Sequence, residues 1–373
     1  MDDHRQLTVC GSFGFGNAGD EAVPLACQDL AKACGIPLAV AVLGRFAKPA
    51  MPEVIGIGNA DQSRRERLRG QPLLMIGGGV IEPAEAGVIW RCADFLPPFS
   101  APAGLFAVNV EANVRYGWLQ RFRLRRLLSR MSLVAVRDEL SGRTLRALAP
   151  KIPVEVVGDS ILWMEPAAEL PPEARAAGRF IAVCLAPRWA NDPAWYAWIG
   201  RELADLANSL DAGLLFVPFS VMADDDRPEH DRVRQAVAAA DPKLVCRISM
   251  IERELPPRQL ARVLGEAQLA VSMRLHGCVM AYAARTPFVA LAYHPKLTGF
   301  TETVGWERFV LPRRFPAAQS AGHYGFSFAD LDWSDAGLAA AGREAVAFAD
   351  FSRLEPLRER LRTAFARFLK GDR

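Results

Sequence analysis

Short apolar segments alternate with longer stretches of helical periodicity along most of the chain. Nearly every position in these segments is apolar, which is typical of strands buried on both faces of a parallel sheet. A helix is expected from about Asp20 to Ala33, after the first strand. The predicted strands of the first half are Leu7–Cys10, Pro37–Leu43, Pro72–Ile76, Leu105–Val108, Leu133–Val136 and Val154–Val157.

The same pattern restarts in the second half of the chain. Residues 167–178 (AAELPPEARAAG) are rich in Pro and Ala without clear periodicity, and we expect them to form a linker. Residues from about Ser334 are predicted to be helical, and Phe348–Phe368 could fold back across the first domain. The predicted strands of this half are Phe180–Leu185, Leu214–Pro218, Val245–Arg247, Leu269–Met273 and Phe288–Tyr293.

Strands that alternate with helices favour an α/β fold. We predict two Rossmann-like domains that face a cleft in a glycosyltransferase-B-like arrangement, at residues 1–166 and 179–345, with a C-terminal helix at 346–373. A chain of 373 residues is too long for one ordinary core, which also favours two domains. Apolar residues make up 51% of the chain, as expected for a well-packed globular protein.

Charge and cysteine usage narrow the classes of function. The net charge is +3, from 45 basic and 42 acidic residues, and it argues against a nucleic-acid partner. The seven cysteines form no CxxC pair and no metal-ligand spacing, so a reduced, cytoplasmic location is the simplest interpretation. No signal peptide is visible in the acidic start MDDHRQLTV, and no apolar run approaches the ~18 residues of a membrane span. Asp224–Asp226 is interpreted as a solvated loop rather than a metal site.

A basic turn follows the predicted strand at Ala270–Met273. Arg274 and His276 are two residues apart and would face one side of an extended backbone, and Gly277 would then open a helix. Lys296 follows the next strand. Because parallel strands end at the same edge of a sheet, these groups predict an anion-binding site with a titratable side chain. The alternative is that Arg274 pairs with a carboxylate and His276 is structural.

Two glycine-rich turns also follow predicted strands. Residues Gly14–Gly19 match GxGxxG, a dinucleotide-binding pattern that requires an acidic residue at the end of the second strand. That strand ends at Arg45 instead, which leaves an NADP-dependent enzyme as an alternative. Gly77–Gly79 would allow close approach of a ligand or simply form a tight turn.

Several blocks carry a resemblance to a known family. They are GSFGFGNAGDEAV at Gly11–Val23, IGGGVI at Ile76–Ile81, VAVRDELSGRTL at Val134–Leu145, VGDSILW at Val157–Trp163, and SMRLHG followed by YHPKLTGF. In this order they resemble the polysaccharide pyruvyl transferase family. The resemblance implies transfer of a pyruvyl ketal from phosphoenolpyruvate to a saccharide or lipid-linked saccharide in cell-surface polysaccharide biosynthesis. No metal or other cofactor is expected.

The chemistry of this reaction predicts roles for individual residues, and the resemblance itself adds Arg137 and the Asp20–Glu21 pair. His276 would be the general acid, and Asp20 or Glu21 would accept the proton of an acceptor hydroxyl. The family often has an acidic residue at the position of His294, so the role of Lys296 is open. The donor would be held by Arg274, Lys296, Arg137, Arg188 and the helix start at Gly277, and the acceptor by Asn17, Gly78 and Gly79.

Other functions remain open from the sequence. A nucleotide-sugar glycosyltransferase would need an acidic residue that binds the nucleotide, for which Glu266 is a candidate. A non-catalytic glycan-binding subunit would not need the general acid at His276. Arg115–Arg130 holds six arginines among apolar residues, and it predicts either peripheral contact with an anionic membrane or the solvated face of a core helix. Trp195 and Trp198 could stack on a sugar, although a core position is more typical.

Overall fold

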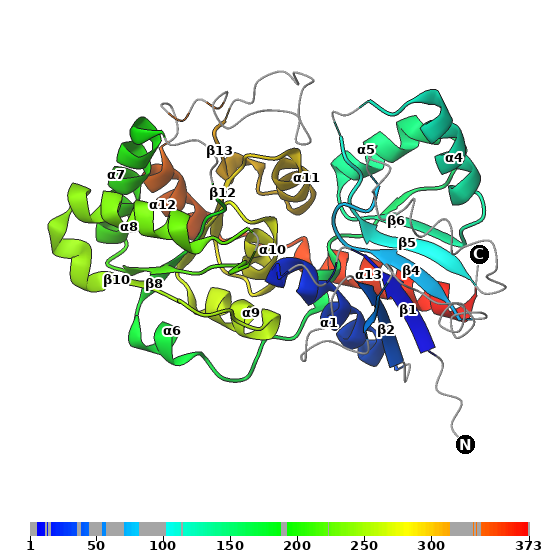
Figure 1. Cartoon of the computed structure of the whole chain (residues 1–373), viewed down its shortest axis with the longest axis horizontal. Coiled ribbons are helices and arrows are strands. Elements are labelled where there is room, and N and C mark those ends of the chain that lie inside the picture. The colour runs from blue at the N-terminus through cyan, green and yellow to red at the C-terminus, as the bar shows by residue number, and fades with distance from the viewer. Residues whose placement is uncertain are drawn as a thin grey trace. The chain divides into compact units, whose positions relative to one another are not determined.

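The chain forms two compact units, each built on a parallel sheet (Figure 1). Unit 1 comprises residues 1–15, 20–164 and 353–373, and unit 2 comprises 16–19 and 165–352. The computed structural model describes residues 6–11, 13, 16–35, 39–44, 54–56, 71–81, 102–112, 115–187, 192–222, 224–313, 331, 333 and 337–371.

Unit 1 contains a seven-stranded sheet in the order β3-β2-β1-β4-β5-β6-β7. The strand order reverses between β1 and β4, and at such a switch point the crevice at the carboxyl ends of the strands is the usual ligand site of open α/β sheets. The strands are β1 (Gln6–Cys10), β2 (Ala39–Gly44), β3 (Val54–Gly56), β4 (Leu73–Ile76), β5 (Ala103–Val108), β6 (Leu133–Val136) and β7 (Glu155–Val156). Its helices are α1 (Ala18–Ala33), α4 (Trp118–Leu128), α5 (Glu139–Leu148) and α13 (Leu354–Lys370), with a 3-10 turn at Ser160–Trp163.

The last helix, α13, completes the core of unit 1. Phe365 lies 5.4 Å from Phe106 of β5, measured between ring centroids. The indole of Trp163 donates to the carbonyl of Arg358 (2.8 Å). Helices α4 and α5 cover one face of the sheet, and α1 and α13 cover the other (Figure 1). The prediction that a C-terminal helix folds back on the first domain is therefore confirmed.

Unit 2 contains a six-stranded sheet in the order β10-β9-β8-β11-β12-β13, with its own switch point between β8 and β11. The strands are β8 (Phe180–Cys184), β9 (Gly213–Phe216), β10 (Ile248–Met250), β11 (Leu269–Ser272), β12 (Phe288–Leu291) and β13 (Val310–Leu311). The helices are α6 (Pro172–Ala176), α7 (Pro193–Ser209), α8 (Arg227–Ala240), α9 (Pro257–Glu266), α10 (Leu275–Ala283), α11 (Pro295–Val304) and α12 (Leu338–Phe348), with 3-10 turns at Pro242–Arg247 and Glu307–Phe309.

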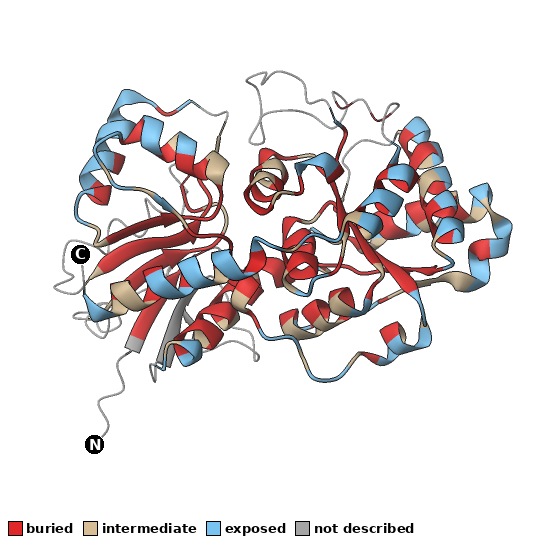
Figure 2. Ribbon diagram, turned by 180° about the vertical axis from the view of Figure 1, so that it is seen from behind, coloured by how far each residue is buried: buried red, intermediate tan, exposed pale blue. Residues whose placement is uncertain are grey.

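The central strands of both sheets are buried along their whole length, as their continuous apolar sequences predict (Figure 2). Trp195 and Trp198 lie in the core of unit 2, where both pack against Trp333, which agrees with the core interpretation of these residues.

Several local predictions were wrong. Val245–Arg247 belongs to a 3-10 turn that begins after Pro242, and the strand follows it at Ile248–Met250. The linker expected at residues 167–178 stays a prediction, and it contains the short helix α6. The helix expected at 346–373 is interrupted, because α12 ends at Phe348 and the next residue has a left-handed backbone (φ 35°).

The cysteines are not all thiols. Cys27, Cys34, Cys184, Cys246 and Cys278 are free, whereas Cys10 is disulfide-bonded. Within the described residues, no helix combines the length and the apolar character needed to cross a membrane.

Candidate functional site

Arg274 lies at the carboxyl end of β11, where it forms the N-cap of α10. Its Nε donates to Oδ2 of Asp226 (3.3 Å), and its Nη2 donates to Oδ1 of the same carboxylate and to the carbonyl of Asp224 (3.2 Å). The Asp226 side chain is fully buried, and that of Arg274 is 12% exposed. The alternative interpretation, in which Arg274 pairs with a carboxylate, is therefore observed.

The buried carboxylate of Asp226 has further partners. Its Oδ2 accepts hydrogen bonds from the amides of Phe219 (2.8 Å) and Ser220 (3.2 Å), which follow β9. Burial raises the pKa of Asp226, while Arg274 and these amides oppose the shift. The expectation that Asp224–Asp226 is a solvated loop is wrong for Asp226, because this residue joins the ends of β9 and β11.

Two of the three nitrogens of the Arg274 guanidinium are already bound within the protein. Nε and Nη2 are bound to Asp226 and Asp224, and Nη1 makes no hydrogen bond with the part of the chain that the structure describes. Arginine carries five N–H groups, so one carboxylate does not exhaust its capacity to donate. Anion binding at this edge of the sheet therefore stays a prediction, and Asp226 offsets part of the positive charge there.

Helix α10 begins earlier than the sequence indicated. Its first residue is Leu275, so His276 lies inside the first turn and the prediction of an extended backbone through His276 is wrong. The amide of Gly277 donates to the carbonyl of Arg274 (3.0 Å) and is not available to a ligand. A Cβ at Gly277 would lie 2.3 Å from Oγ of Ser272, so this glycine is explained by close packing of the helix on β11.

His276 packs against the backbone at the start of α1. A Cβ added at Gly19 would lie 2.1 Å from Nδ1 of His276 and 2.8 Å from its Cβ. Only glycine allows this approach. The side-chain oxygen of Asn17 accepts from the amide of Gly19 (3.0 Å), and Asn17 also forms a β-bridge with Ser220. Unit 2 therefore brings together the GNAG segment and His276, residues that are far apart in the sequence.

Lys296 lies in the first turn of α11 rather than in a turn that precedes it. His294 is the N-cap of this helix, and its Nδ1 accepts from the amide of Lys296 (3.2 Å). An aspartate at this position would supply the same kind of acceptor. The ammonium group of Lys296 lies 6.0 Å from the centre of the Tyr293 ring. The histidine thus preserves the cap that fixes the start of the helix.

Arg137 lies at the carboxyl end of β6 in unit 1, and its side chain is buried. Its Nε donates to Asp138 (3.1 Å), its Nη2 donates to Asn109 (2.7 Å), and its Nη1 lies 3.7 Å from a carboxylate oxygen of Asp159. Burial raises the pKa of Asp159, and Arg137 opposes this shift. A guanidinium surrounded in this way holds strand ends together, and a role for Arg137 in binding the donor stays a prediction.

The glycine turn after β4 adjoins Asp20 and Arg137. Gly77 and Gly79 have left-handed backbones (φ 95° and 63°), which accounts for these two glycines as a tight turn. Gly78 has no such backbone, and a Cβ there would lie 3.9 Å from Oδ1 of Asp20 and 4.0 Å from Nη1 of Arg137. Asp20 is half-buried, whereas Glu21 is 5% exposed. Asp20 is therefore the more accessible of the two candidate bases.

Two positions that the sequence singled out, Arg188 and Arg45, lie outside the described residues. Sequence reasoning also missed residues that bind the candidate arginines. These are Asp226, the partner of Arg274, and Asn109 and Asp159, the partners of Arg137. For Asn109 and Asp159 the available signal was that each closely follows a predicted strand, whereas Asp226 lies well beyond the end of Leu214–Pro218.

A comparison with protein-family models identifies the family. The model for polysaccharide pyruvyl transferase matches residues 17–295, which is most of the chain. The chain belongs to this family. The matched region holds Asp20, Gly78, Arg137 and the Arg274–His276 turn, and it ends immediately before Lys296.

Solved structures place this polysaccharide pyruvyl transferase family member in a fold class. A Listeria monocytogenes protein assigned as a UDP-N-acetylglucosamine 2-epimerase superposes with a TM-score of 0.55 at 13% identity, covering 96% of this chain and 91% of that chain. S. aureus MnaA, in a structure with UDP, superposes with a TM-score of 0.51 at 13% identity, and the match covers 96% of this chain and 90% of MnaA. A glycosyltransferase from Rickettsia africae ESF-5 superposes with a TM-score of 0.51 at 11% identity, and the match covers 100% of this chain and 94% of the glycosyltransferase.

Identities this low show the fold alone. The predicted glycosyltransferase-B-like class is confirmed. No match was found among curated proteins. Glu266, the candidate nucleotide ligand, is exposed and pairs with Arg262 one helical turn away (2.7 Å).

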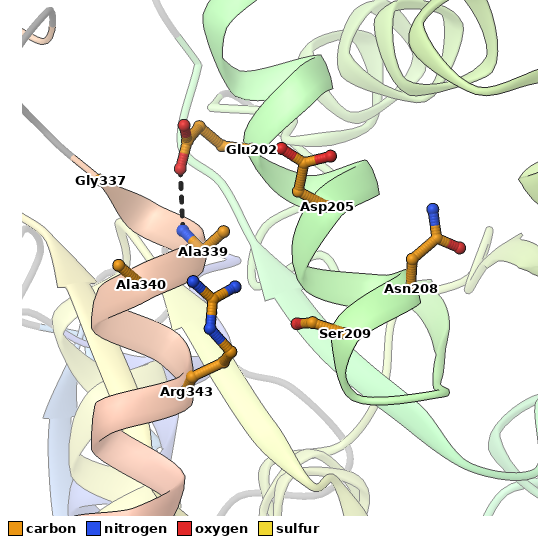
Figure 3. Close-up of a pocket in the computed structure, with 8 residues that line it drawn as sticks. All are labelled: Glu202, Asp205, Asn208, Ser209, Gly337, Ala339, Ala340 and Arg343. Carbon is orange, nitrogen blue, oxygen red and sulfur yellow. Dashed lines mark hydrogen bonds between the residues drawn. The ribbon is translucent and has the colours of Figure 1, made fainter.

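The pyruvyl transferase family member also has an open hollow of about 600 Å³ between α7 and α12 (Figure 3). One oxygen of Glu202 accepts from the amide of Ala339 (2.8 Å) and so caps α12. None of the predicted site residues lines this hollow. The predicted site residues lie elsewhere, near strand ends within each unit.

Proposed function

We propose that this protein transfers a pyruvyl group from phosphoenolpyruvate to a saccharide, where it forms a cyclic ketal. The proposal rests on family membership across residues 17–295 and on one contact inside that region, the packing of His276 on Gly19. That contact joins the glycine-rich motif to the basic turn after β11, which are the two most distinctive blocks of the sequence.

The donor carries a carboxylate and a phosphate and therefore needs fixed cations. Arg274 would bind one of these anions through Nη1, and its other nitrogens, held by Asp226 and Asp224, fix the plane of the guanidinium. Lys296 would add a second positive charge from the first turn of α11, where His294 caps the helix. Helix N-termini at both positions favour anions.

His276 would act as the general acid. A proton is added to the methylene carbon of phosphoenolpyruvate, which becomes the methyl group, and C2 becomes electrophilic. One sugar hydroxyl bonds to C2, the bond from C2 to the phosphate oxygen breaks, and a second hydroxyl closes the ketal. Of the two hydroxyl protons, one replaces the proton that His276 gave and the other leaves with phosphate. Asp20, which directly follows Gly19 in the chain, would accept the hydroxyl proton that later replaces the one given by His276.

Donor binding and catalytic turnover are measured separately, because Arg274 is proposed to bind the donor and His276 to act in catalysis. Thermal unfolding should be followed during parallel titrations with phosphoenolpyruvate, UDP-sugars and NADPH, because a ligand that binds the folded protein raises its stability. Phosphoenolpyruvate should raise the melting temperature. Arg274→Lys should weaken this binding about 10- to 150-fold through loss of a charged hydrogen bond. Arg227→Lys is the matched control, because Arg227 directly follows Asp226, the partner of Arg274, and forms a partly exposed pair with Asp225.

Turnover is measured as phosphate released from phosphoenolpyruvate in the presence of saccharides that carry neighbouring hydroxyls. His276→Ala should abolish most of the release and leave the thermal shift intact. A shift with a UDP-sugar or NADPH and none with phosphoenolpyruvate would overturn the proposal. Unchanged turnover in His276→Ala would overturn the role of His276 alone.

A further inference from the structure

We propose that the outward face of α4 docks on an anionic lipid surface. This inference is independent of the pyruvyl transfer proposed above, because it rests on one helix of unit 1 and its test requires no substrate. Helix α4 spans Trp118–Leu128, which is too short to cross a membrane, so the helix would lie on the surface of a bilayer.

The outward face of α4 carries large apolar side chains. Trp118 is 81% exposed, Phe122 is 58% exposed and Leu119 is 49% exposed. Trp118 and Phe122 are four residues apart, as neighbours on one helical face are, and Leu119 adjoins them. The opposite face is already used, because the core side of α4 is formed by Leu124, Leu127 and Leu128.

In the described part of the chain, few other large apolar side chains are exposed. Among the described residues the others are Met222 and Val245, which lie in different segments of unit 2. A cluster of this kind on a single helix indicates an interaction surface, whereas scattered exposed residues do not.

Arginines surround this apolar cluster without balancing acids. Residues 115–130 contain six arginines and no Asp or Glu. Within the described residues, none of the six forms an ion pair. Arg121 and Arg125 donate only to backbone carbonyls, of Tyr116 (3.1 Å) and Leu148 (2.7 Å). Among the residues that the structure describes, no ion pair therefore offsets the positive charge of this helix, in a chain whose net charge is only +3.

Charge and apolar area together favour lipid over other partners. Trp and Phe are the side chains that settle at the boundary between headgroups and acyl chains, while arginine reaches the phosphates beside them. Leu119, between Trp118 and Phe122, cannot stack on nucleic-acid bases, whereas its side chain would be buried favourably among acyl chains. A second copy of this chain would bring the same six arginines to the interface, which opposes self-association.

The first test is cosedimentation of the full chain with vesicles. Binding is expected with vesicles that contain phosphatidylglycerol, and it should weaken as salt rises. Trp118→Ser with Phe122→Ser should lower the partition coefficient at least about 10-fold. Met222→Ser with Val245→Ser is the matched control, because these residues are similarly exposed, and it should leave binding unchanged. The exposed positions leave the melting temperature of each variant near that of the parent.

The second test removes charge. Arg123→Gln with Arg126→Gln should lower binding about 30-fold, since each basic residue near an anionic surface contributes about 1 kcal/mol. The control is Arg201→Gln with Arg360→Gln, which removes equal charge from exposed sites on α7 and α13. The proposal would be overturned if the parent protein bound pure phosphatidylcholine vesicles as well as vesicles that contain phosphatidylglycerol. It would also be overturned if both arginine pairs lowered binding equally, or if neither α4 variant lowered it. A dimer or an RNA complex that depends on Trp118 and Phe122 without any vesicle binding would likewise overturn it.

Discussion

Replacing Arg274 by Ala should destabilise the protein strongly, quite apart from any loss of donor binding. Arg274 is the counter-charge of Asp226, whose side chain is fully buried. Removing one partner of a buried pair leaves an uncompensated charge and typically costs about 3–5 kcal/mol. The amides of Phe219 and Ser220 still bind the carboxylate, but they carry no net charge.

Protonation limits this cost and gives it a pH dependence. Neutralising an aspartate costs about 1.36 kcal/mol for each pH unit above its ordinary pKa of about 3.9, which is about 4 kcal/mol at pH 7 and about 1.5 kcal/mol at pH 5. A carboxyl whose folded pKa is raised destabilises the folded state at pH values above its unfolded pKa, and the effect fades as the pH falls. The loss from Arg274→Ala should therefore be about 3–4 kcal/mol at pH 7 and about 1.5 kcal/mol at pH 5.

Urea unfolding at the two pH values, followed by circular dichroism, gives this loss relative to the parent. Adding Asp226→Asn to Arg274→Ala should recover much of it at pH 7, because the amide keeps one acceptor oxygen without the charge. Arg227→Ala, which breaks a partly exposed pair with Asp225, should cost less than about 1 kcal/mol. A loss below about 1 kcal/mol for Arg274→Ala at pH 7, or one that does not shrink at pH 5, would refute the buried charge pair.

Three further predictions use other contacts. Gly19→Ala should lower turnover at least about 10-fold with little effect on donor binding, because its methyl group displaces His276, whereas Gly337→Ala meets nothing closer than 3.6 Å and should be neutral in the same assays. Burial lowers the pKa of His230 to about 3, so its contribution to stability is complete above about pH 6.5 and is lost as the pH falls toward 3. The free energy of unfolding should drop by about 2 kcal/mol between pH 7 and pH 5, and a drop that persists in His230→Gln would contradict this assignment. His294→Ala removes the cap of α11 and should cost about 1 kcal/mol and weaken donor binding, while His294→Asp should restore both in urea and titration measurements.

The sequence predicted the strands well because a parallel sheet demands continuous apolar segments. Leu133–Val136 was predicted with its observed ends, and most others within one or two residues. Short edge strands such as Val310–Leu311 escaped prediction, because two apolar residues carry no periodicity. The start of α10 was misplaced because Arg274 caps the helix with its backbone and leaves no capping side chain as a signal.

The candidate site was predicted less completely, for a physical reason. Arg274 and His276 were found from their place at a strand end, but their surroundings come from distant segments. Asp226 is 48 residues from Arg274 in the sequence, and local patterning favoured a solvated loop for it. Arg137 was expected to be open, but Asn109 and Asp159 reach it from neighbouring strand ends. Such pairs depend on strand order, which no local pattern specifies.

The position of α13 has a consequence for how the polypeptide is made. Leu361, Phe365 and Phe368 fill the core of unit 1, yet the ribosome produces them only after all of residues 165–352. The first domain to emerge therefore waits with an uncovered apolar sheet face, including Phe106, while the second can finish folding. In this protein the order of synthesis and the order of completion are reversed, and stalled chains that lack α13 should be bound by chaperones through unit 1.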